Sequence, residues 1–122
     1  MAVTLVQRPL SGSTDGLPIE VSATAGGATT VHTMVTGTTT IDRVFMWAGN
    51  TSTADITLIL EWGASADRYK EVIPAKATAY PVLTGQPVWG RSGSVSATVL
   101  KAHAFTSAVI KLVGYVNRVT ES

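Results

Sequence analysis

The chain has 122 residues, the size of one domain with a single hydrophobic core. Charged residues make up only 14% of it, against roughly 25% in an average soluble domain, and the formal net charge is +1. A net charge this small produces only a weak electrostatic field, which does not attract phosphates or anionic lipid. We therefore expect neither nucleic acid nor a membrane as partner. The absence of cysteine excludes disulfides, thiolate metal sites and thiol nucleophiles.

The N-terminal segment, residues 1–17, is predicted to be an extended arm that precedes a β-sandwich domain of residues 18–122. It starts with apolar residues and ends in a run of serine, glycine, threonine and aspartate, a composition typical of turns and linkers. It lacks the long apolar core of a signal peptide, and no stretch has the roughly 18 apolar residues of a transmembrane helix, so we expect synthesis in the cytoplasm. Apolar side chains on an arm favour contact with a neighbouring subunit, here through Val3, Leu5, Val6 and Leu10.

Short strands are predicted after the arm, because apolar and polar residues alternate with period two between turns rich in glycine. The first strands are expected over residues 18–23, 29–36 and 40–48. The third of these contains the run Val44-Phe45-Met46-Trp47, which is apolar on both faces and indicates a strand covered on both sides. One strand of a small open sandwich cannot hide both faces, so we expect Val44 and Met46 at or near a subunit contact.

The clearest strand is residues 55–62, where Ile56, Leu58 and Leu60 alternate with polar neighbours, with Ile59 the exception. A shorter strand is predicted over residues 68–73. It starts with Arg68, Tyr69 and Lys70, a small basic and aromatic cluster that is either solvated or docks on an acidic protein surface.

Residues 75–85 are predicted to be an irregular link, and residues 86–90 an edge strand or strand start because they include Pro87. Alternation returns over residues 94–100 and 107–119. About seven or eight short strands with turns every eight to twelve residues or so predict an all-β fold, an antiparallel two-sheet β-sandwich of jelly-roll or immunoglobulin-like type.

The sequence does not single out a catalytic or metal-binding set. His32 and His103 lie in different segments without an acidic neighbour at ligand spacing. Residues 63–67 resemble a nucleophile elbow but lack its second glycine, and no glycine-rich phosphate loop is present. We therefore expect a protein without enzymatic activity and without a cofactor, one that binds or assembles.

The three tryptophans leave one alternative open. Trp62 is in phase with the apolar face of its strand, and Trp47 is in phase with Phe45, so both are predicted to lie in a core or interface. Trp89 lies near a turn and is the least explained. If exposed, it would offer a stacking surface for sugars, as in a carbohydrate- or receptor-binding module.

The second half of the chain contains a particular order of segments: Leu58-Ile59-Leu60-Glu61-Trp62-Gly63, then Tyr69–Lys76, Val82–Val88, Gly93–Ala97 and a closing Val113-Gly114-Tyr115-Val116-Asn117-Arg118-Val119. Over residues 40–120 this order resembles that of the small head-decoration (cement) proteins, and similar minor structural proteins, of tailed bacteriophages. The resemblance implies a β-sandwich or jelly roll that assembles, often as a trimer, on the outer surface of the capsid and clamps neighbouring major capsid subunits. It implies no catalytic residue.

We therefore expect a virion structural protein on the outer capsid surface whose partners are the major capsid protein and further copies of itself. The residues expected at its contacts are Val3, Leu5, Val6, Leu10, Val44, Met46, Arg68, Tyr69 and Trp89. The alternative is a carbohydrate- or receptor-binding β-sandwich module of a head fibre or tail.

Overall fold

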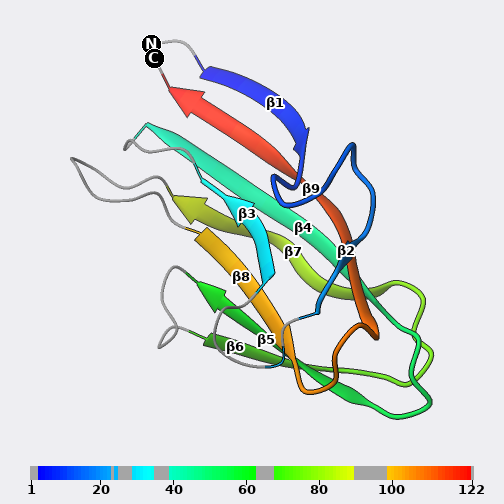
Figure 1. The fold of residues 1–122 in the computed structure, drawn as a ribbon. Coiled ribbons are helices and arrows are strands. Elements are labelled where there is room, and N and C mark those ends of the chain that lie inside the picture. Colours follow the sequence, from blue (N-terminus) through cyan, green and yellow to red (C-terminus); the bar gives the residue numbers. More distant parts are fainter. Residues whose placement is uncertain are drawn as a thin grey trace.

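The structure, a computed structural model, describes residues 3–22, 24, 29–34, 39–62, 68–89 and 99–121, and every regular element in these ranges is a β-strand (Figure 1). The strands are β1 (Val3–Pro9), β2 (Ile19–Glu20), β3 (Thr29–Thr33), β4 (Thr40–Asn50), β5 (Ile56–Trp62), β6 (Arg68–Ile73), β7 (Tyr80–Trp89), β8 (Val99–Ala104) and β9 (Ile110–Glu121). The predicted all-β fold with two antiparallel sheets is confirmed.

The first sheet has the strand order β1-β9-β4-β7, and β2 pairs with β9 beside it; the second sheet has the order β3-β8-β5-β6. The pairing of β9 continues from β1, at Pro9 opposite Tyr115, to β2, at Ile19 opposite Leu112. The strands β1 and β2 therefore act as one interrupted strand.

The pairings are nested along the chain. The first strand pairs with the last, β3 with β8, β4 with β7 and β5 with β6, as in one long hairpin that has been rolled up. Rolling adds the pairings β4–β9 and β5–β8. Two sheets connected in this way form a jelly roll, one of the two predicted types.

The core lies between the sheets, and on β4 buried residues alternate strictly with more exposed ones. On β4 the residues Val44, Met46 and Ala48 point inward, opposite Leu58 and Leu60 of β5 in the second sheet. Other fully buried core residues are Leu10, Val21, Val31, Ile73, Val88, Leu100, Ala102, Ala104, Ile110, Leu112 and Val116.

Two expected contact residues, Val44 and Met46, are therefore corrected: both are fully buried in the core and cannot meet a partner. The two faces of the run on β4 are apolar for different reasons. One face packs between the sheets, and the other, with Phe45 and Trp47, lies on the outside of the first sheet. The sequence pattern does not distinguish the two, because both faces are apolar.

Residues 3–9 of the predicted arm form strand β1, which pairs with β9 from Val3 opposite Glu121 to Pro9 opposite Tyr115. In Figure 1, β1 and β9 lie side by side. The next residue, Leu10, was expected at a subunit contact; this is corrected, because it is buried in the core. The Gly12 N–H donates to the Val31 carbonyl oxygen at 2.9 Å, which attaches the following turn to β3.

The predicted irregular link also differs from the structure, since β7 starts at Tyr80 and includes Pro81 and Pro87. Prolines are compatible with this strand because it is an edge strand with two register shifts against β4. Most of the predicted strand over residues 94–100 lies outside the described residues.

Candidate functional site

The expected contact residues fall into three groups. Val3, Leu5 and Val6 on β1 and Tyr69 on β6 are exposed. Leu10, Val44 and Met46 are in the core. Arg68 and Trp89 belong to β6 and β7, but their side chains lie outside the described residues. The structure therefore does not bring the nine residues together in one site.

The outer face of the first sheet is the side that points away from the second sheet. Its residues alternate with the core residues of β4 and β9 and occupy matching cross-strand positions. They include Leu5, Gln7 and Pro9 on β1, Ile41, Arg43, Phe45 and Trp47 on β4, Pro81, Thr84 and Pro87 on β7, and Lys111, Val113, Tyr115, Asn117 and Val119 on β9.

Three aromatic side chains form a cluster at the centre of this outer face. Phe45 and Tyr115 are cross-strand partners whose rings stack with centroids 5.1 Å apart, and Trp47 lies 6.1 Å from Tyr115. Stacked cross-strand aromatic pairs hold one another in place. All three side chains are half-buried, so part of each ring remains at the surface.

Glycines allow this cluster to form. At Gly114 the strands β4 and β9 approach so closely that a Cβ would overlap the Phe45 carbonyl oxygen. At Gly85, where φ is +106°, a Cβ would lie 3.3 Å from the tip of the Phe45 ring. The ring of Phe45 can therefore lie over the β7 backbone.

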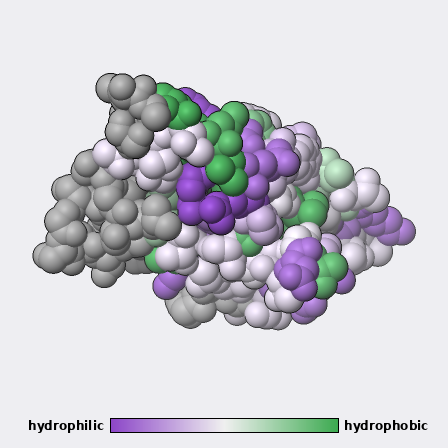
Figure 2. Space-filling model, turned by 90° about the horizontal axis from the view of Figure 1, so that it is seen from above, coloured by the Kyte–Doolittle hydropathy of each residue, from purple (hydrophilic) through white to green (hydrophobic). Residues whose placement is uncertain are grey.

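Charged side chains flank the aromatic cluster on the outer face: Arg43 on β4, and Lys111 on β9 opposite Glu20 of β2. Arg43 donates from Nη1 to the Gly85 carbonyl oxygen at 3.2 Å, and Val113 is 41% exposed beside the aromatic cluster. In the view from above the molecule, hydrophobic side chains gather in a patch directly beside hydrophilic ones (Figure 2). Exposed apolar patches surrounded by polar residues are typical of protein interaction sites.

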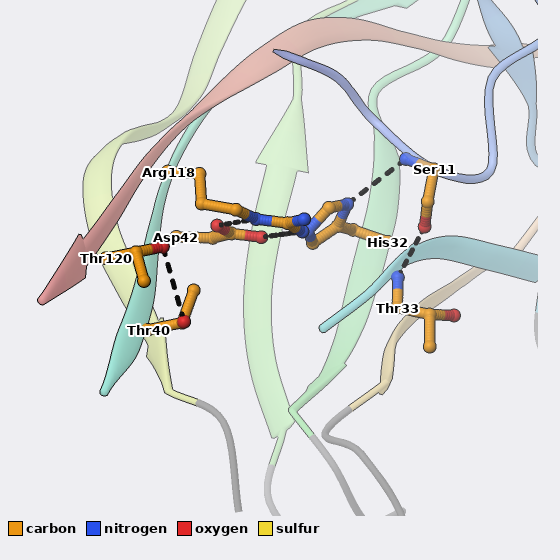
Figure 3. A network of polar contacts seen from close by, with 7 residues as sticks. All are labelled: Ser11, His32, Thr33, Thr40, Asp42, Arg118 and Thr120. Carbon is orange, nitrogen blue, oxygen red and sulfur yellow. Dashed lines mark hydrogen bonds and ion pairs between the residues drawn. The ribbon is translucent and has the colours of Figure 1, made fainter. Parts of the chain in front are cut away.

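A second candidate site is the polar network around Asp42, which points inward from β4 (Figure 3). Arg118, its cross-strand partner on β9, donates from Nε to Oδ1 at 2.8 Å and from Nη2 to Oδ2 at 2.9 Å. His32 reaches the same carboxylate from β3 in the other sheet, with 2.7 Å between Nε2 and Oδ2. The network therefore joins the two sheets.

The tautomer of His32 follows from its second contact. The Ser11 main-chain N–H donates to Nδ1 at 3.1 Å, so Nδ1 is the acceptor and Nε2–H donates to Asp42. The Ser11 hydroxyl oxygen accepts the Thr33 N–H at 2.6 Å. A catalytic triad instead needs the serine hydroxyl to donate to the histidine ring. The contacts here position the turn after β1 against β3.

Burial by itself raises the pKa of the Asp42 carboxyl, but the hydrogen bonds and charges of Arg118 and His32 outweigh it and lower this pKa from 3.8 to about 2. The same hydrogen bond raises the pKa of Arg118. Among the described residues, every buried side-chain nitrogen and oxygen has a hydrogen-bond partner. The Asp42 network is thus fully satisfied.

The acidic partners of the two histidines are not predicted from the sequence. His103 contacts Glu61 at 3.0 Å across the neighbouring strands β8 and β5, and His32 contacts Asp42, although neither pair is close in the chain. Asp42 is in phase with Val44 and Met46, but the sequence does not show which phase of β4 is buried, so its partner could not be predicted. Once the phase is known, a buried carboxylate requires such a partner. Within the described ranges, acidic and histidine side chains do not form a group of three or more that could hold a metal ion.

Two hollows adjoin these features. One, of about 350 Å³, lies beside the Asp42 network and is lined by Arg8, Pro9, Ser11, His32, Thr33 and Arg118. The other, of about 230 Å³, opens between β6 and β7 and is lined by Leu60, Tyr69, Lys70, Glu71, Val82, Leu83 and Gln86. Next to this second hollow the rings of Tyr69 and Trp62 meet edge to face at 5.5 Å.

The stability of the protein is expected to fall between about pH 4 and pH 2 through Asp42. Because its pKa is lowered from 3.8 to about 2, its carboxylate stabilises the fold fully above about pH 4, and this contribution of about 2 kcal/mol is lost as the pH falls through 2. Urea unfolding followed by tryptophan fluorescence at a series of pH values measures the loss. The Asp42→Asn variant should lack this part of the pH dependence; an unchanged profile in that variant would contradict the assignment.

Comparisons with models of protein families, with curated proteins and with solved structures each find no match to this chain. In the described part of the chain, a helix of the length and apolar character needed to cross a membrane does not occur.

Proposed function

We propose that this protein is a virion structural protein that decorates the head of a tailed bacteriophage and binds the major capsid protein. The observation that carries the proposal is the outer face of the first sheet, with its aromatic cluster of Phe45, Trp47 and Tyr115. A jelly roll needs only one face of each sheet for its core, so an apolar opposite face is available to a partner.

Two further points support the proposal. The jelly roll is a common architecture of viral capsid domains, although a fold alone does not determine function. The order of segments over residues 40–120 resembles that of small phage decoration proteins, and the closing run of that resemblance lies on β9, which supplies Val113 and Tyr115 to the outer face.

The test is co-sedimentation with capsids of the phage that encodes the chain, assembled without it. The wild-type protein should bind these capsids saturably. Val113→Asp, which puts a charge into the apolar outer face, should weaken binding by about tenfold or more. The matched control is Val72→Asp on β6 of the second sheet, where Val72 is similarly exposed at 50%; it should bind like the wild type. Absence of binding by the folded wild-type protein, or equal loss in both variants, would refute the proposal.

A carbohydrate- or receptor-binding module is the second candidate. It is favoured by Tyr69, which is 61% exposed next to Trp62 at the hollow between β6 and β7. Aromatic rings beside amide and charged groups can bind sugars by stacking and hydrogen bonding. Sugar-dependent quenching of tryptophan fluorescence that disappears in Tyr69→Ala would favour this function over capsid decoration.

A further inference from the structure

In the described part of the chain the two sheets have four edges: β1, continued by β2, and β7 in the first sheet, and β3 and β6 in the second. An edge strand presents unpaired N–H and C=O groups and invites pairing with another chain, so proteins usually protect edges with charges, prolines, bulges or short strands. The four edges of this jelly roll differ in how well they are protected.

Three of them carry such protection. The strand β6 contains Arg68, Lys70 and Glu71. The strand β7 contains Pro81 and Pro87, which lack an N–H, together with two register shifts. The strand β3 has only five residues and a register shift of its own.

The strand β1 is unprotected over most of its length. Its sequence from Val3 to Gln7 is without charge or proline, and Arg8 and Pro9 occur only at its end. All seven of its side chains are exposed, and among the described residues it has a strand neighbour only on the β9 side. Its backbone groups on the other side are therefore available to a further strand.

An apolar row of side chains runs to this open edge. On the outer face, Ile41 of β4 is opposite Val119 of β9, and Val119 is opposite Leu5 of β1. The row ends at Leu5, which is 67% exposed. A strand that joins the edge and continues this row needs an apolar residue opposite Leu5.

A second copy of β1 meets that requirement. In an antiparallel pair centred on Leu5, this residue faces its own copy, Thr4 faces Val6 and Val3 faces Gln7. Arg8 and Pro9 stay outside the new ladder, and the apolar row continues without interruption into the second molecule. We propose that β1 pairs with β1 of a second copy around a two-fold axis and joins the two first sheets into one continuous sheet. This inference does not depend on the proposed capsid function.

The first experiment measures mass in solution by light scattering and sedimentation equilibrium. The wild-type chain should form a dimer of twice its 12.7 kDa mass. Leu5→Lys places two like charges opposite each other in the dimer and should raise the dissociation constant by about tenfold or more. The matched control, Val72→Lys on the charged edge strand β6, should stay dimeric. A wild-type monomer or trimer, or dissociation by Val72→Lys but not by Leu5→Lys, would overturn the inference.

The second experiment tests the register by disulfide formation, which is specific here because the chain has no cysteine of its own. Directly opposite residues of antiparallel strands have Cα atoms about 4.5–5.5 Å apart, within the roughly 4.4–6.8 Å that a disulfide spans. Leu5→Cys should therefore give a covalent dimer quickly on oxidation. Gln7→Cys lies on the same face of the same strand but faces Val3 of the copy, so it should cross-link far more slowly. Equal rates for the two variants would show random collision and contradict the centred pair.

Discussion

Replacing Asp42 with alanine is expected to lower the free energy of unfolding by about 3–5 kcal/mol, because it leaves the partners of a buried carboxylate without their anion. Arg118 donates two hydrogen bonds to Asp42 and His32 donates one, and Asp42 itself is fully buried. Urea unfolding at pH 7, followed by tryptophan fluorescence and circular dichroism, measures the change.

The control for this variant is Glu20→Ala, which removes an exposed carboxylate from β2 and should change stability by no more than about 0.5 kcal/mol. A loss below about 1 kcal/mol for Asp42→Ala would place the network among ordinary surface ion pairs. In that case the connection that it makes between β3, β4 and β9 would not contribute to the stability of the jelly roll.

The sequence predicts the fold best where one face of a strand is apolar and the other polar. The strand predicted over residues 55–62 corresponds to β5, and the one over residues 68–73 has the bounds of β6. The prediction fails at β7, because proline and glycine residues are read as breakers although an edge strand tolerates them. It also cannot tell an arm from an edge strand at β1, since all side chains of this strand are exposed and only its backbone is paired.

The candidate site could be predicted only in part, for a related reason. The apolar run of β4 predicts that both of its faces are covered, and the structure shows this for one face only. Which face points inward is set by pairing with β9 and by the second sheet, which are far away in the sequence. In the structure Asp42 lies in the inward phase with Val44 and Met46, and Arg118 of β9 and His32 of β3 satisfy its carboxylate. The outward phase, Phe45 and Trp47, then becomes the candidate contact surface.

If Val44 and Met46 face the core while Phe45 and Trp47 face outward, aspartate substitutions on the two sides should have opposite outcomes. Met46→Asp puts a carboxyl group without a partner into the core, where Met46 is fully buried, and should cost about 5 kcal/mol or more, as much as the whole stability of many small domains. The variant should therefore be unfolded or insoluble, as shown by loss of near-ultraviolet circular dichroism and of cooperative thermal unfolding.

Val113→Asp puts the same charge on the outer face, opposite Trp47, where the side chain is 41% exposed and the carboxylate stays hydrated. This variant should remain folded, with a loss of about 1 kcal/mol or less. If Met46→Asp instead folded as a soluble protein while Val113→Asp did not, the inward and outward phases of β4 and β9 would be exchanged, and the aromatic cluster would belong to the core. The surface proposed for the capsid would then be Val44 and Met46, as the two-faced run of β4 first indicated.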